Sequence, residues 1–556
     1  MSTAFLPDRD KDLVRDLAVG FVPFPADRAE EYRRAGYWTG RRLDSILSEA
    51  AAARPDKPAI VDAQSSYTFA ELDTLADRVA AGFADLGIAA GDRVLLQLPN
   101  SCQFAIAFFG LLRAGAVPVM CLPGHRTAEL GHFAQISDAV ALIVPDKAAG
   151  FDYREMAAQL VAGHPALRHV IVDGEAGPYV PWSSLVGFSG TLAEPEPVET
   201  SLPALLLVSG GTTGLPKLIA RTHDDYVYTA VACAQACEMT DRDAYLVALP
   251  AGHNFPLGCP GMLGSMTVGA TTVFTADPSP ENAFALIDKH QITVTGLVNA
   301  LAKLWAQACE WEPVLPTSLR FVQVGGSRMS PEDARFILER LTPGMSQIFG
   351  MAEGMLNFTR PGDPEDVVVH TQGRPMSPHD EMRVVDENGD EVLLGDEGEL
   401  LVRGPYTLNG YYRDDEANAR SFSPDGFYRS GDRVRIFADG PRAGYVEVVG
   451  RIKDVIHRGG ETVSATDLED HLHTHPAIYA AAAVALPDEY LGEKICAAVV
   501  FRGKPISLAE LNAFLDERGA STHARPDVLA PLPSLPTTAV GKVDKKALVA
   551  RLSSAQ

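Results

Sequence analysis

A glycine-rich run at residues 209–217, SGGTTGLPK, carries the residue types that bind phosphate groups. Glycines let backbone amides approach phosphate oxygens, hydroxyls donate hydrogen bonds, and a lysine supplies positive charge. The spacing G-x-x-x-x-G-K-[ST] of common nucleotide hydrolases is absent, because Leu215 and Pro216 separate the last glycine from Lys217. The run therefore predicts a polyphosphate-binding loop of another kind, with a plain polar turn after an apolar strand at 204–208 as the alternative.

Four further motifs follow the glycine-rich run at wide spacing. They are QIFGMAE at 347–353, YRSGD at 428–432, GRIKD at 450–454 and PTTAVGKVDKK at 536–546. The five motifs, in this order, resemble those of the acyl-adenylate-forming enzymes, a superfamily that activates carboxylic acids with ATP. The resemblance covers nearly the whole chain and implies an ATP-dependent ligase that uses Mg²⁺. A binding or structural protein would have no reason to keep all five.

The resemblance implies a role for each motif. Glu353 would be the magnesium ligand, and Asp432 would accept hydrogen bonds from the ribose. In the implied reaction an acid oxygen attacks the α-phosphorus of ATP and expels pyrophosphate, so Mg²⁺, hydroxyl groups and the Lys542 ammonium would neutralise the charge that gathers there. The implied catalytic residues are Lys542, Glu353, Thr212, Thr213 and Lys217, and the implied nucleotide-binding residues are Ser209, Gly210, Gly211, Gly214, Gly325, Gly326, Phe349, Gly350, Asp432 and Arg451.

The same resemblance makes Asp454 a hinge between two domains. A rotation there would withdraw Lys542 and bring the loop at 457–461, HRGGE, towards the adenylate. The thiol of a phosphopantetheine arm would then attack the acyl carbonyl and give a thioester and AMP. Residues 43–47, LDSIL, resemble a phosphopantetheine attachment site only superficially, because the preceding glycine is missing. We therefore expect Ser45 to lie in a helix and the carrier protein to be a separate chain.

The run at 253–261, HNFPLGCPG, indicates which acid is activated. Amino-acid-activating relatives typically carry an aspartate at the position of Asn254, where it pairs with the substrate ammonium. A neutral asparagine cannot offset the free-energy cost of burying an ammonium ion, but its amide can hydrogen-bond an ortho hydroxyl on a benzoate. The run resembles the stand-alone aryl-acid ligases, which load salicylate or 2,3-dihydroxybenzoate to start siderophore and related peptide assembly lines.

Three positions refine the expected acid. Cys259 and Leu356 stand where dihydroxybenzoate ligases usually carry serine and valine, and a weakly bonding thiol and a larger side chain favour salicylate. Gly258 replaces an expected alanine or serine, and the extra space would admit a substituted salicylate. The implied substrate-binding residues are His253, Asn254, Phe255, Gly258, Cys259, Ser327, Ile348, Ala352 and Leu356. A 2,3-dihydroxybenzoate ligase and an aryl-coenzyme A ligase remain alternatives, while the polar Asn254 disfavours a luciferase-like oxidase.

Length, charge and cysteine usage fit a large enzyme. The 556 residues exceed the ~250–300 at which a single core stops growing, so at least two domains are expected. A net charge of −24 argues against nucleic acid or an anionic membrane as a partner. The start lacks an apolar signal core, the apolar run at 104–112 suits a buried helix, and seven cysteines without C-x-x-C predict reduced thiols, so we expect a cytoplasmic protein.

Two clusters of metal-binding residue types are expected to be structural. Cys233 and Cys237 share a helix face but supply only two ligands. His471, His473 and His475 alternate along a helix and therefore do not share a face. We expect no zinc site at either place.

The order of apolar segments predicts the fold class. Short apolar strands, such as 141–144 and 205–208, alternate with amphipathic stretches, which is typical of an α/β fold. We expect an N-terminal wrap at 31–38 and an N-terminal domain at 1–453 made of two α/β subdomains plus a small β-barrel at 381–450. A small mobile α+β domain at 454–556, with strands such as 495–500, would carry Lys542.

Overall fold

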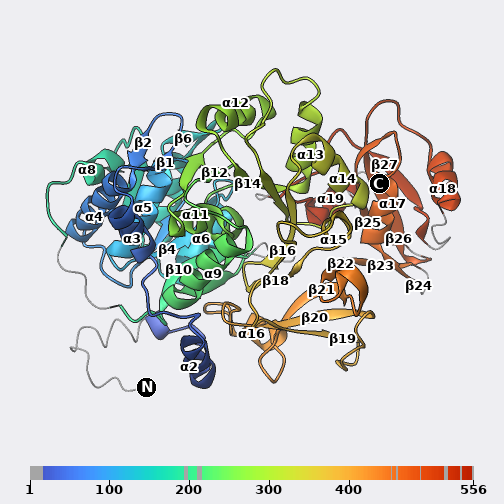
Figure 1. The fold of residues 1–556 in the computed structure, drawn as a ribbon, viewed down its shortest axis with the longest axis horizontal. Helices are drawn as coiled ribbons and strands as arrows, with labels where there is room; N and C mark the ends of the chain where they lie inside the picture. The colour runs from blue at the N-terminus through green and yellow to red at the C-terminus, as the bar shows by residue number, and fades with distance from the viewer. Residues whose placement is uncertain are drawn as a thin grey trace.

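Two large sheets of mostly parallel strands form the bulk of the structure, a computed structural model that describes residues 17–192, 198–209, 216–452, 454–458, 461–488, 490–518, 524–538 and 541–553 (Figure 1). The first sheet has the order β18-β17-β16-β15-β14-β12-β13-β1-β2. Its strands are β1 (Pro58–Val61), β2 (Ser66–Thr68), β12 (Ala244–Val247), β13 (Thr271–Phe274), β14 (Val294–Val298), β15 (Phe321–Gly325), β16 (Met345–Met351), β17 (Gly354–Phe358) and β18 (Arg374–Pro375). The neighbouring strands β16, β15, β14, β12, β13 and β1 pair in parallel. Their C-terminal ends therefore share one edge of the sheet, the usual place for ligands in such sheets.

The second sheet has the order β11-β10-β4-β3-β5-β8-β9. Its strands are β3 (Arg93–Leu96), β4 (Val117–Met120), β5 (Ala141–Pro145), β8 (His169–Asp173), β9 (Val180–Pro181), β10 (Pro203–Val208) and β11 (Leu218–Thr222), and a separate hairpin joins β6 (Lys147–Ala148) and β7 (Phe151–Asp152). The strands β3, β4, β5 and β10 are buried along their whole length, because helices cover the sheet. The expected alternation of strands and helices is confirmed.

Helices pack on these sheets. They are α3 (Ser45–Ala53), α4 (Phe69–Asp85), α5 (Cys102–Arg113), α6 (Thr127–Ser137), α7 (Tyr153–Gly163), α8 (Trp182–Val186), α9 (His223–Ala236), α10 (Asn254–Gly258), α11 (Gly261–Thr267), α12 (Pro280–His290), α13 (Asn299–Ala308), α14 (Pro331–Arg340) and α15 (Glu365–His370). Almost every residue of α5 is buried, which confirms the expected core helix, and Ser45 begins α3 as expected. In the part of the chain that the structure describes, no helix is long and apolar enough to cross a bilayer.

An N-terminal strap, residues 21–44, crosses the outside of the molecule and includes α2 (Ala26–Arg34). Trp38 is buried and donates from Nε1 to the carbonyl of Pro405 at 3.0 Å. Arg28 pairs with Glu381 at 3.1 Å, and Arg33 pairs with Asp224 at 3.3 Å. The strap therefore joins α9 to the β layer described next, which agrees with the expected N-terminal wrap.

The β layer is a four-stranded antiparallel sheet in the order β19-β20-β21-β22. It contains β19 (Glu381–Val385), β20 (Glu397–Arg403), β21 (Tyr428–Ile436) and β22 (Val446–Arg451), with α16 (Asp415–Ser421) and the 3₁₀ turn η1 (Gly440–Arg442) between strands. Each strand pairs with the next along the chain. Within the described residues no pair joins β19 to β22, so the expected barrel-like layer is an open sheet.

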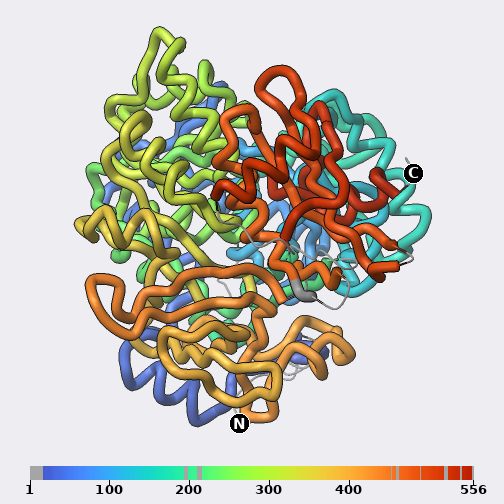
Figure 2. Tube along the Cα trace, turned by 90° about the vertical axis from the view of Figure 1, so that its right-hand side faces the viewer, coloured from blue at the N-terminus to red at the C-terminus, as the bar shows by residue number. Residues whose placement is uncertain are grey.

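The C-terminal residues form a body of their own, red in Figure 2, above the orange β layer. Their sheet contains β23 (Val455–Arg458), β24 (Glu461–Ser464), β25 (Ile478–Asp488), β26 (Gly492–Phe501) and β27 (Val528–Pro531), and their helices are α17 (Ala465–His473), α18 (Leu508–Glu517) and α19 (Lys545–Ser553). Two apolar clusters pack on the two faces of this sheet and contain only residues after 455. A separate core supports the expected α+β unit, while its mobility and the boundary at 453/454 stay predictions.

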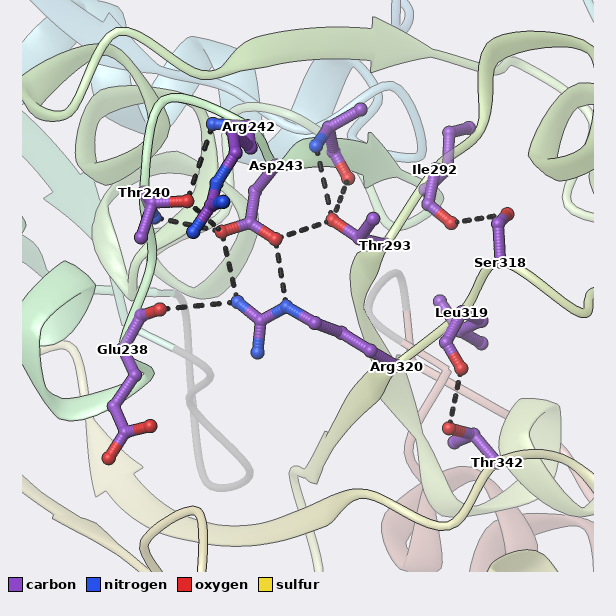
Figure 3. A network of polar contacts seen from close by, with 11 residues as sticks. Glu238, Thr240, Arg242, Asp243, Ile292, Thr293, Ser318, Leu319, Arg320 and Thr342 are labelled. Carbon is purple, nitrogen blue, oxygen red and sulfur yellow. Dashed lines mark hydrogen bonds and ion pairs between the residues drawn. The ribbon is translucent and has the colours of Figure 1, made fainter.

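A polar network closes the edge of the nine-stranded sheet that lies opposite the strand C-termini (Figure 3). Asp243 accepts hydrogen bonds from Arg320 at 2.8 and 3.0 Å, from Thr293 Oγ1 at 2.7 Å and from the Thr240 amide at 2.8 Å. Burial opposes ionisation, but the bonds from Arg320, Thr240 and Thr293 lower the pKa of Asp243. Because Asp243, Thr293 and Arg320 precede β12, β14 and β15, the network anchors three strand starts and leaves the opposite edge for function.

Candidate active site

The glycine-rich loop connects two antiparallel strands. It leaves β10 at Ser209 and enters β11 after Lys217. The Ser209 amide donates to the Lys217 carbonyl at 2.9 Å, and the Lys217 amide donates to Ser209 Oγ at 2.9 Å. A common P-loop leads from a strand into a helix, so this strand–loop–strand topology agrees with the spacing argument. The expected phosphate contacts at Gly210, Gly211, Thr212, Thr213 and Gly214 lie outside the described residues.

Glu353 and Lys217 meet at a tyrosine that the sequence analysis missed. Tyr411 donates from its hydroxyl to Glu353 Oε1 at 2.9 Å, and its ring centroid lies 4.7 Å from Lys217 Nζ. A second tyrosine, Tyr428, lies 2.9 Å away, hydroxyl to hydroxyl. Burial, and then the charge of Glu353, raise the pKa of Tyr411, so this hydroxyl stays a donor at neutral pH. A tyrosine pair in the segment NGYYRDD gave no signal for this role.

Asp432 and Arg451 face each other across β21 and β22. They are register partners, and Arg451 Nε donates to Asp432 Oδ1 at 3.1 Å. Asp432 is 6% exposed, and burial raises its pKa although the Arg451 charge opposes the rise. The Asp432 charge in turn raises the pKa of Arg451. The residue expected to bind ribose is therefore a buried carboxylate held by one arginine.

Lys542 reaches this cluster from the last part of the chain. A Cβ atom built on Gly326, which has a φ of +99°, would lie 3.3 Å from Lys542 Cε. Burial and the charge of Arg451 lower the pKa of Lys542, while the charges of Asp432 and Glu353 oppose that shift. Five motifs spread over the sequence therefore meet in one place, which we call the nucleotide-side cluster: Lys217, Gly326, Glu353, Tyr411, Asp432, Arg451 and Lys542.

The two expected adenine contacts lie on β16. Phe349 is half-buried, and its carbonyl accepts a hydrogen bond from Asn357 Nδ2 at 3.3 Å. Gly350 pairs with Leu356 across the β16–β17 hairpin, and a Cβ atom at Gly350 would collide with the Leu356 side chain. The expected adenine contacts and the expected wall residue Leu356 therefore share one hairpin, whose turn carries Glu353.

The residues around the short helix α10 form what we call the acid-side cluster: Tyr226, His253, Asn254, Phe255, Gly258 and Cys259. His253 caps this helix by accepting the Phe255 amide on Nδ1 at 3.3 Å. The Phe255 ring lies against the middle of β14 and the end of β15, because Cβ atoms at Gly296 and Gly325 would lie 3.1 and 3.6 Å from it. Burial, and then the Lys542 charge, lower the pKa of His253 to about 4, so the imidazole is neutral at physiological pH. His253 therefore lies near enough to Lys542, the expected catalytic lysine, to be affected by its charge.

Asn254 is buried and bonded at both ends of its amide. Tyr226 on α9 donates to Asn254 Oδ1 at 2.8 Å, and Asn254 Nδ2 donates to Cys259 Sγ at 3.5 Å. Both partners are buried. Sequence reasoning selected Asn254 and Cys259 but missed Tyr226, because a tyrosine in an amphipathic helix also fits a packed core.

The expectation that Gly258 opens space for a ring substituent is wrong. A Cβ atom added at Gly258 would lie 3.0 Å from both Cζ and Oη of Tyr226. The tyrosine therefore occupies the space that a side chain at this position would need. A side chain here would press on Tyr226, so the glycine suits the packing of that ring and gives no argument for a substituted salicylate.

The other expected wall residues fall into two groups. Ile348 is buried beside Gly325, and Ala352 is half-buried with its carbonyl bonded to Arg221 Nη1 at 3.1 Å. Ser327 is exposed, and its hydroxyl accepts a hydrogen bond from Asn299 Nδ2 at 3.0 Å. Ile348 and Ala352 therefore reach the acid-side cluster through Gly325 and Arg221, whereas Ser327 lies on the surface just after β15.

Ion pairs lie beside the expected hinge, and one of them, between Arg328 and Asp470, joins the two expected domains. Asp454 lies 3.6 Å from Lys545 Nζ, and Lys545 also binds Glu469 at 2.9 Å. Arg328 of the large domain bridges Glu447 at 3.2 Å and Asp470 of α17 at 3.1 Å. Lys453 and the glycines 459 and 460 of the HRGGE loop lie outside the described residues. The contacts at Asp454 leave its role as a hinge a prediction.

In the described part of the chain, members of the cysteine and histidine clusters bond to other protein groups. All seven cysteines are free thiols. Cys233 and Cys237 are buried, and Cys237 accepts a hydrogen bond from Gln323 at 3.1 Å. His473 bonds the backbone of Ala481. Among the described residues no group of three or more His, Cys, Asp or Glu side chains is placed to hold a metal ion.

Comparisons with known proteins match nearly the whole chain. A family model for AMP-binding enzymes matches residues 47–412, and a model for the C-terminal domain of AMP-binding enzymes matches residues 467–542. The chain is 63% identical over 541 residues to the salicyl-AMP ligase / salicyl-S-ArCP synthetase of Mycobacterium tuberculosis, covering 96% of this chain and 95% of the relative. It is 46% identical over 529 residues to the 2,3-dihydroxybenzoate-AMP ligase of Bacillus subtilis, covering 95% and 97%.

Solved structures agree. The apo structure of MbtA from Mycobacterium smegmatis is 64% identical, with a TM-score of 0.77, and covers 96% of this chain and 99% of that chain. The anthranilate CoA ligase AuaEII, at 23% identity and a TM-score of 0.82 over 93% of this chain and 98% of that chain, shares the fold. The chain therefore belongs to the AMP-binding enzyme family, the acyl-adenylate-forming ligases whose motifs it carries. The predicted family, fold class and ligase activity are confirmed.

Proposed function

We propose that this ligase activates salicylate with ATP to salicyl-AMP and then transfers the acyl group to the phosphopantetheine thiol of a separate aryl carrier protein. The observation that carries the proposal is the buried, neutral Asn254 with Cys259 beside it. The 63% identical relative named salicyl-AMP ligase supports the same substrate, and its second name, salicyl-S-ArCP synthetase, supports the carrier protein. The product would enter siderophore or related natural-product assembly.

In the first step, a carboxylate oxygen of the acid attacks the α-phosphorus, the bond to the bridging oxygen breaks, and pyrophosphate leaves. Lys542 would lie beside both the attacked phosphate and the acid carboxylate, because the charge of Lys542 acts on His253 as well as on Asp432. Its ammonium would stabilise the negative charge that builds up in the transition state. Lys217, Thr212 and Thr213 would bind the departing phosphates.

The ribose would hydrogen-bond Asp432. The Asp432 carboxylate has one oxygen bonded to Arg451, and the other has no partner among the described residues. A buried carboxylate in this state fits a donor pair such as two ribose hydroxyls. Arg451 would keep Asp432 ionised and oriented.

Glu353 fits a divalent cation. Its carboxylate is 9% exposed, Oε1 accepts from Tyr411, and Oε2 has no hydrogen-bond partner among the described residues. Mg²⁺ in such sites is usually held by one or two carboxylates together with substrate phosphates. When bound, Mg²⁺ would supply positive charge at the phosphate oxygens. Tyr411 would orient the carboxylate, and Lys217 would neutralise charge on the same side.

The second step requires Lys542 to leave the site. The structure has Lys542 inside the nucleotide-side cluster, which suits adenylation. Rotation about Asp454 would remove this lysine and admit a thiol, which attacks the acyl carbon as the bond to the AMP oxygen breaks. Arg328 and Asp470 would have to separate in that rotation, because they lie in different domains.

Two alternatives differ in the acid or in the acceptor. A 2,3-dihydroxybenzoate substrate needs a partner for its 3-hydroxyl, and a buried thiol is a weak one. Coenzyme A in place of a carrier protein would use the same adenylate. The relative named salicylyl-CoA synthase / salicylate adenylyltransferase, 42% identical over 548 residues, makes this acceptor worth testing.

ATP–pyrophosphate exchange on the purified protein tests the acid. Salicylate should give the highest kcat/KM in a panel with 2,3-dihydroxybenzoate, 3-hydroxybenzoate, benzoate, anthranilate, 6-methylsalicylate, amino acids and fatty acids. Exchange with only amino or fatty acids would overturn the proposal. Mass spectrometry of a phosphopantetheinylated aryl carrier protein, with coenzyme A as the competing acceptor, then tests the second step.

A further inference from the structure

The two ends of the Asn254 amide have unequal partners. Oδ1 accepts a hydrogen bond from the Tyr226 hydroxyl at 2.8 Å, whereas Nδ2 donates to a sulfur at 3.5 Å. A tyrosine hydroxyl is a strong donor, while the Cys259 sulfur is a weak acceptor that takes one of the two N–H bonds. Asn254 therefore has one end fixed and one N–H left for a ligand.

The amide orientation follows from the proton on Tyr226. Among the described residues Asn254 Oδ1 is the acceptor that the structure records for this hydroxyl. Turning the amide over would leave the hydroxyl proton of Tyr226 without an acceptor in a fully buried place, which costs free energy. Tyr226 therefore determines that Asn254 offers a donor and keeps its acceptor occupied.

Tyr226 is itself held on three sides. It lies in the first turn of α9, and the guanidinium of Arg221 lies 4.9 Å from its ring centroid. Arg221 is buried and paired with Asp225 at 2.8 Å. Gly258 packs against the phenol so closely that an added Cβ atom would lie 3.0 Å from its hydroxyl. The ring therefore has little freedom to move away from Asn254.

We propose that Tyr226 is a positioning residue that makes the acid site select an ortho substituent able to accept a hydrogen bond, so that a 2-hydroxy acid is preferred over a 2-amino acid. In salicylate the ortho hydroxyl donates to its own carboxylate and turns a lone pair outward, which suits an N–H donor. In anthranilate the nitrogen lone pair is delocalised into the ring, and the outward N–H would face another N–H. This inference rests on the proposed function and deepens it.

Tyr226→Phe tests the inference, because it keeps the ring and removes the hydroxyl. The measured quantity is the ratio of kcat/KM for salicylate to that for anthranilate in ATP–pyrophosphate exchange. Freed from Tyr226, the Asn254 amide can turn its oxygen to the ligand, so the ratio should fall about tenfold, the scale of one net hydrogen bond. The KM for ATP should stay at the wild-type value.

Two further variants separate positioning from damage. Gly258→Ala should lower the same ratio by pushing the Tyr226 hydroxyl away, and its effect should shrink when Tyr226→Phe is already present. Tyr228→Phe is the matched control, because its hydroxyl bonds Ser377 at 2.8 Å and not Asn254. Its ratio should equal that of the wild type.

The outcomes distinguish the inference from the proposed function. A wild-type enzyme that exchanges no aryl acid would sink the proposed function itself. A wild-type enzyme that prefers salicylate, together with an unchanged ratio in folded Tyr226→Phe, would overturn only the positioning role. If Tyr226→Phe melts below the assay temperature, Gly258→Ala takes its place in the test. A salicylate-to-anthranilate ratio unchanged in Gly258→Ala, including one left unchanged because both acids lose activity in parallel, would then overturn the positioning role of Tyr226.

Discussion

The nucleotide side and the acid side of the site are built from different chemistry. Acidic and basic residues dominate the nucleotide-side cluster, and three of them act on one another: Asp432 on Arg451, and both on Lys542. The acid-side cluster is neutral, since Tyr226, Asn254 and Cys259 form a chain of hydrogen bonds without a charge. Charge stabilises phosphoryl transfer, whereas directional neutral bonds select the acid. Substitutions on the first side should therefore change rate, and those on the second should change selectivity.

Lys542→Ala should give the largest effect. We expect adenylation to fall by on the order of 10²–10³-fold for every acid tested, because a charge-stabilising donor is lost from the transition state. The ratio between acids should stay constant. Lys546→Ala, an exposed lysine of α19, is the control. A change in acid selectivity with a preserved rate would contradict the division between the two sides.

Asp454→Pro should separate the two steps. Proline restricts the backbone rotation at the expected hinge, so thioester formation should fall by on the order of 10²-fold while pyrophosphate exchange persists. Asp454→Ala controls for the loss of the carboxylate contact to Lys545. Single-turnover assays of each step provide the measurement. Equal loss of both steps in the proline variant would refute domain alternation.

Cys259→Ser should change selectivity without changing the chemistry. A serine hydroxyl is a better partner than a thiol for a 3-hydroxyl group, so kcat/KM for 2,3-dihydroxybenzoate should rise about three- to tenfold relative to salicylate. The KM for ATP should not move. Cys309→Ser, at a half-buried thiol after α13, is the comparison variant. No gain towards 2,3-dihydroxybenzoate would remove Cys259 from the selectivity argument.

Asp380 should give the smallest effect, one on stability. It accepts from Tyr406 at 2.6 Å, and the Tyr406 hydroxyl accepts from the Leu356 amide behind the acid side. Burial raises the pKa of Asp380 from 3.8 to about 7, although the hydrogen bonds from Tyr406 and Ser377 oppose the rise. Between about pH 4 and 7, Asp380 therefore holds a proton in the folded state that it has released in the unfolded state.

That proton makes the stability contribution of Asp380 fall as pH rises. The contribution is complete below about pH 4 and is lost as pH rises through about 7. Asp380→Asn cannot ionise, so the melting temperature of the wild type should decline relative to the variant between about pH 4 and 7. Thermal melts at unit pH steps measure this. If the melting temperatures of the wild type and the variant change with pH in parallel, Asp380 does not keep the acid side uncharged.

Much of the fold could be predicted from local pattern, and part of the site could not. The strand expected at 141–144 is β5, because continuous apolar runs predict buried parallel strands. The strand expected at 495–500 is longer, Gly492–Phe501, because it pairs along the whole of β25. Charged motif residues were recognisable since their types have few other uses. Tyr226 and Tyr411 were not, because their partners lie 28 and 58 residues away and buried tyrosines also fill cores.

The central claim is that the acid side works because it is neutral. Asn254→Asp changes one amide into a carboxylate of the same shape, which places a negative charge beside the bound acid. At pH 8 we expect pyrophosphate exchange with salicylate to fall by on the order of 10²-fold, with the KM for ATP unchanged, because a buried unpaired charge is costly. Wild-type exchange with salicylate in this variant would contradict the account.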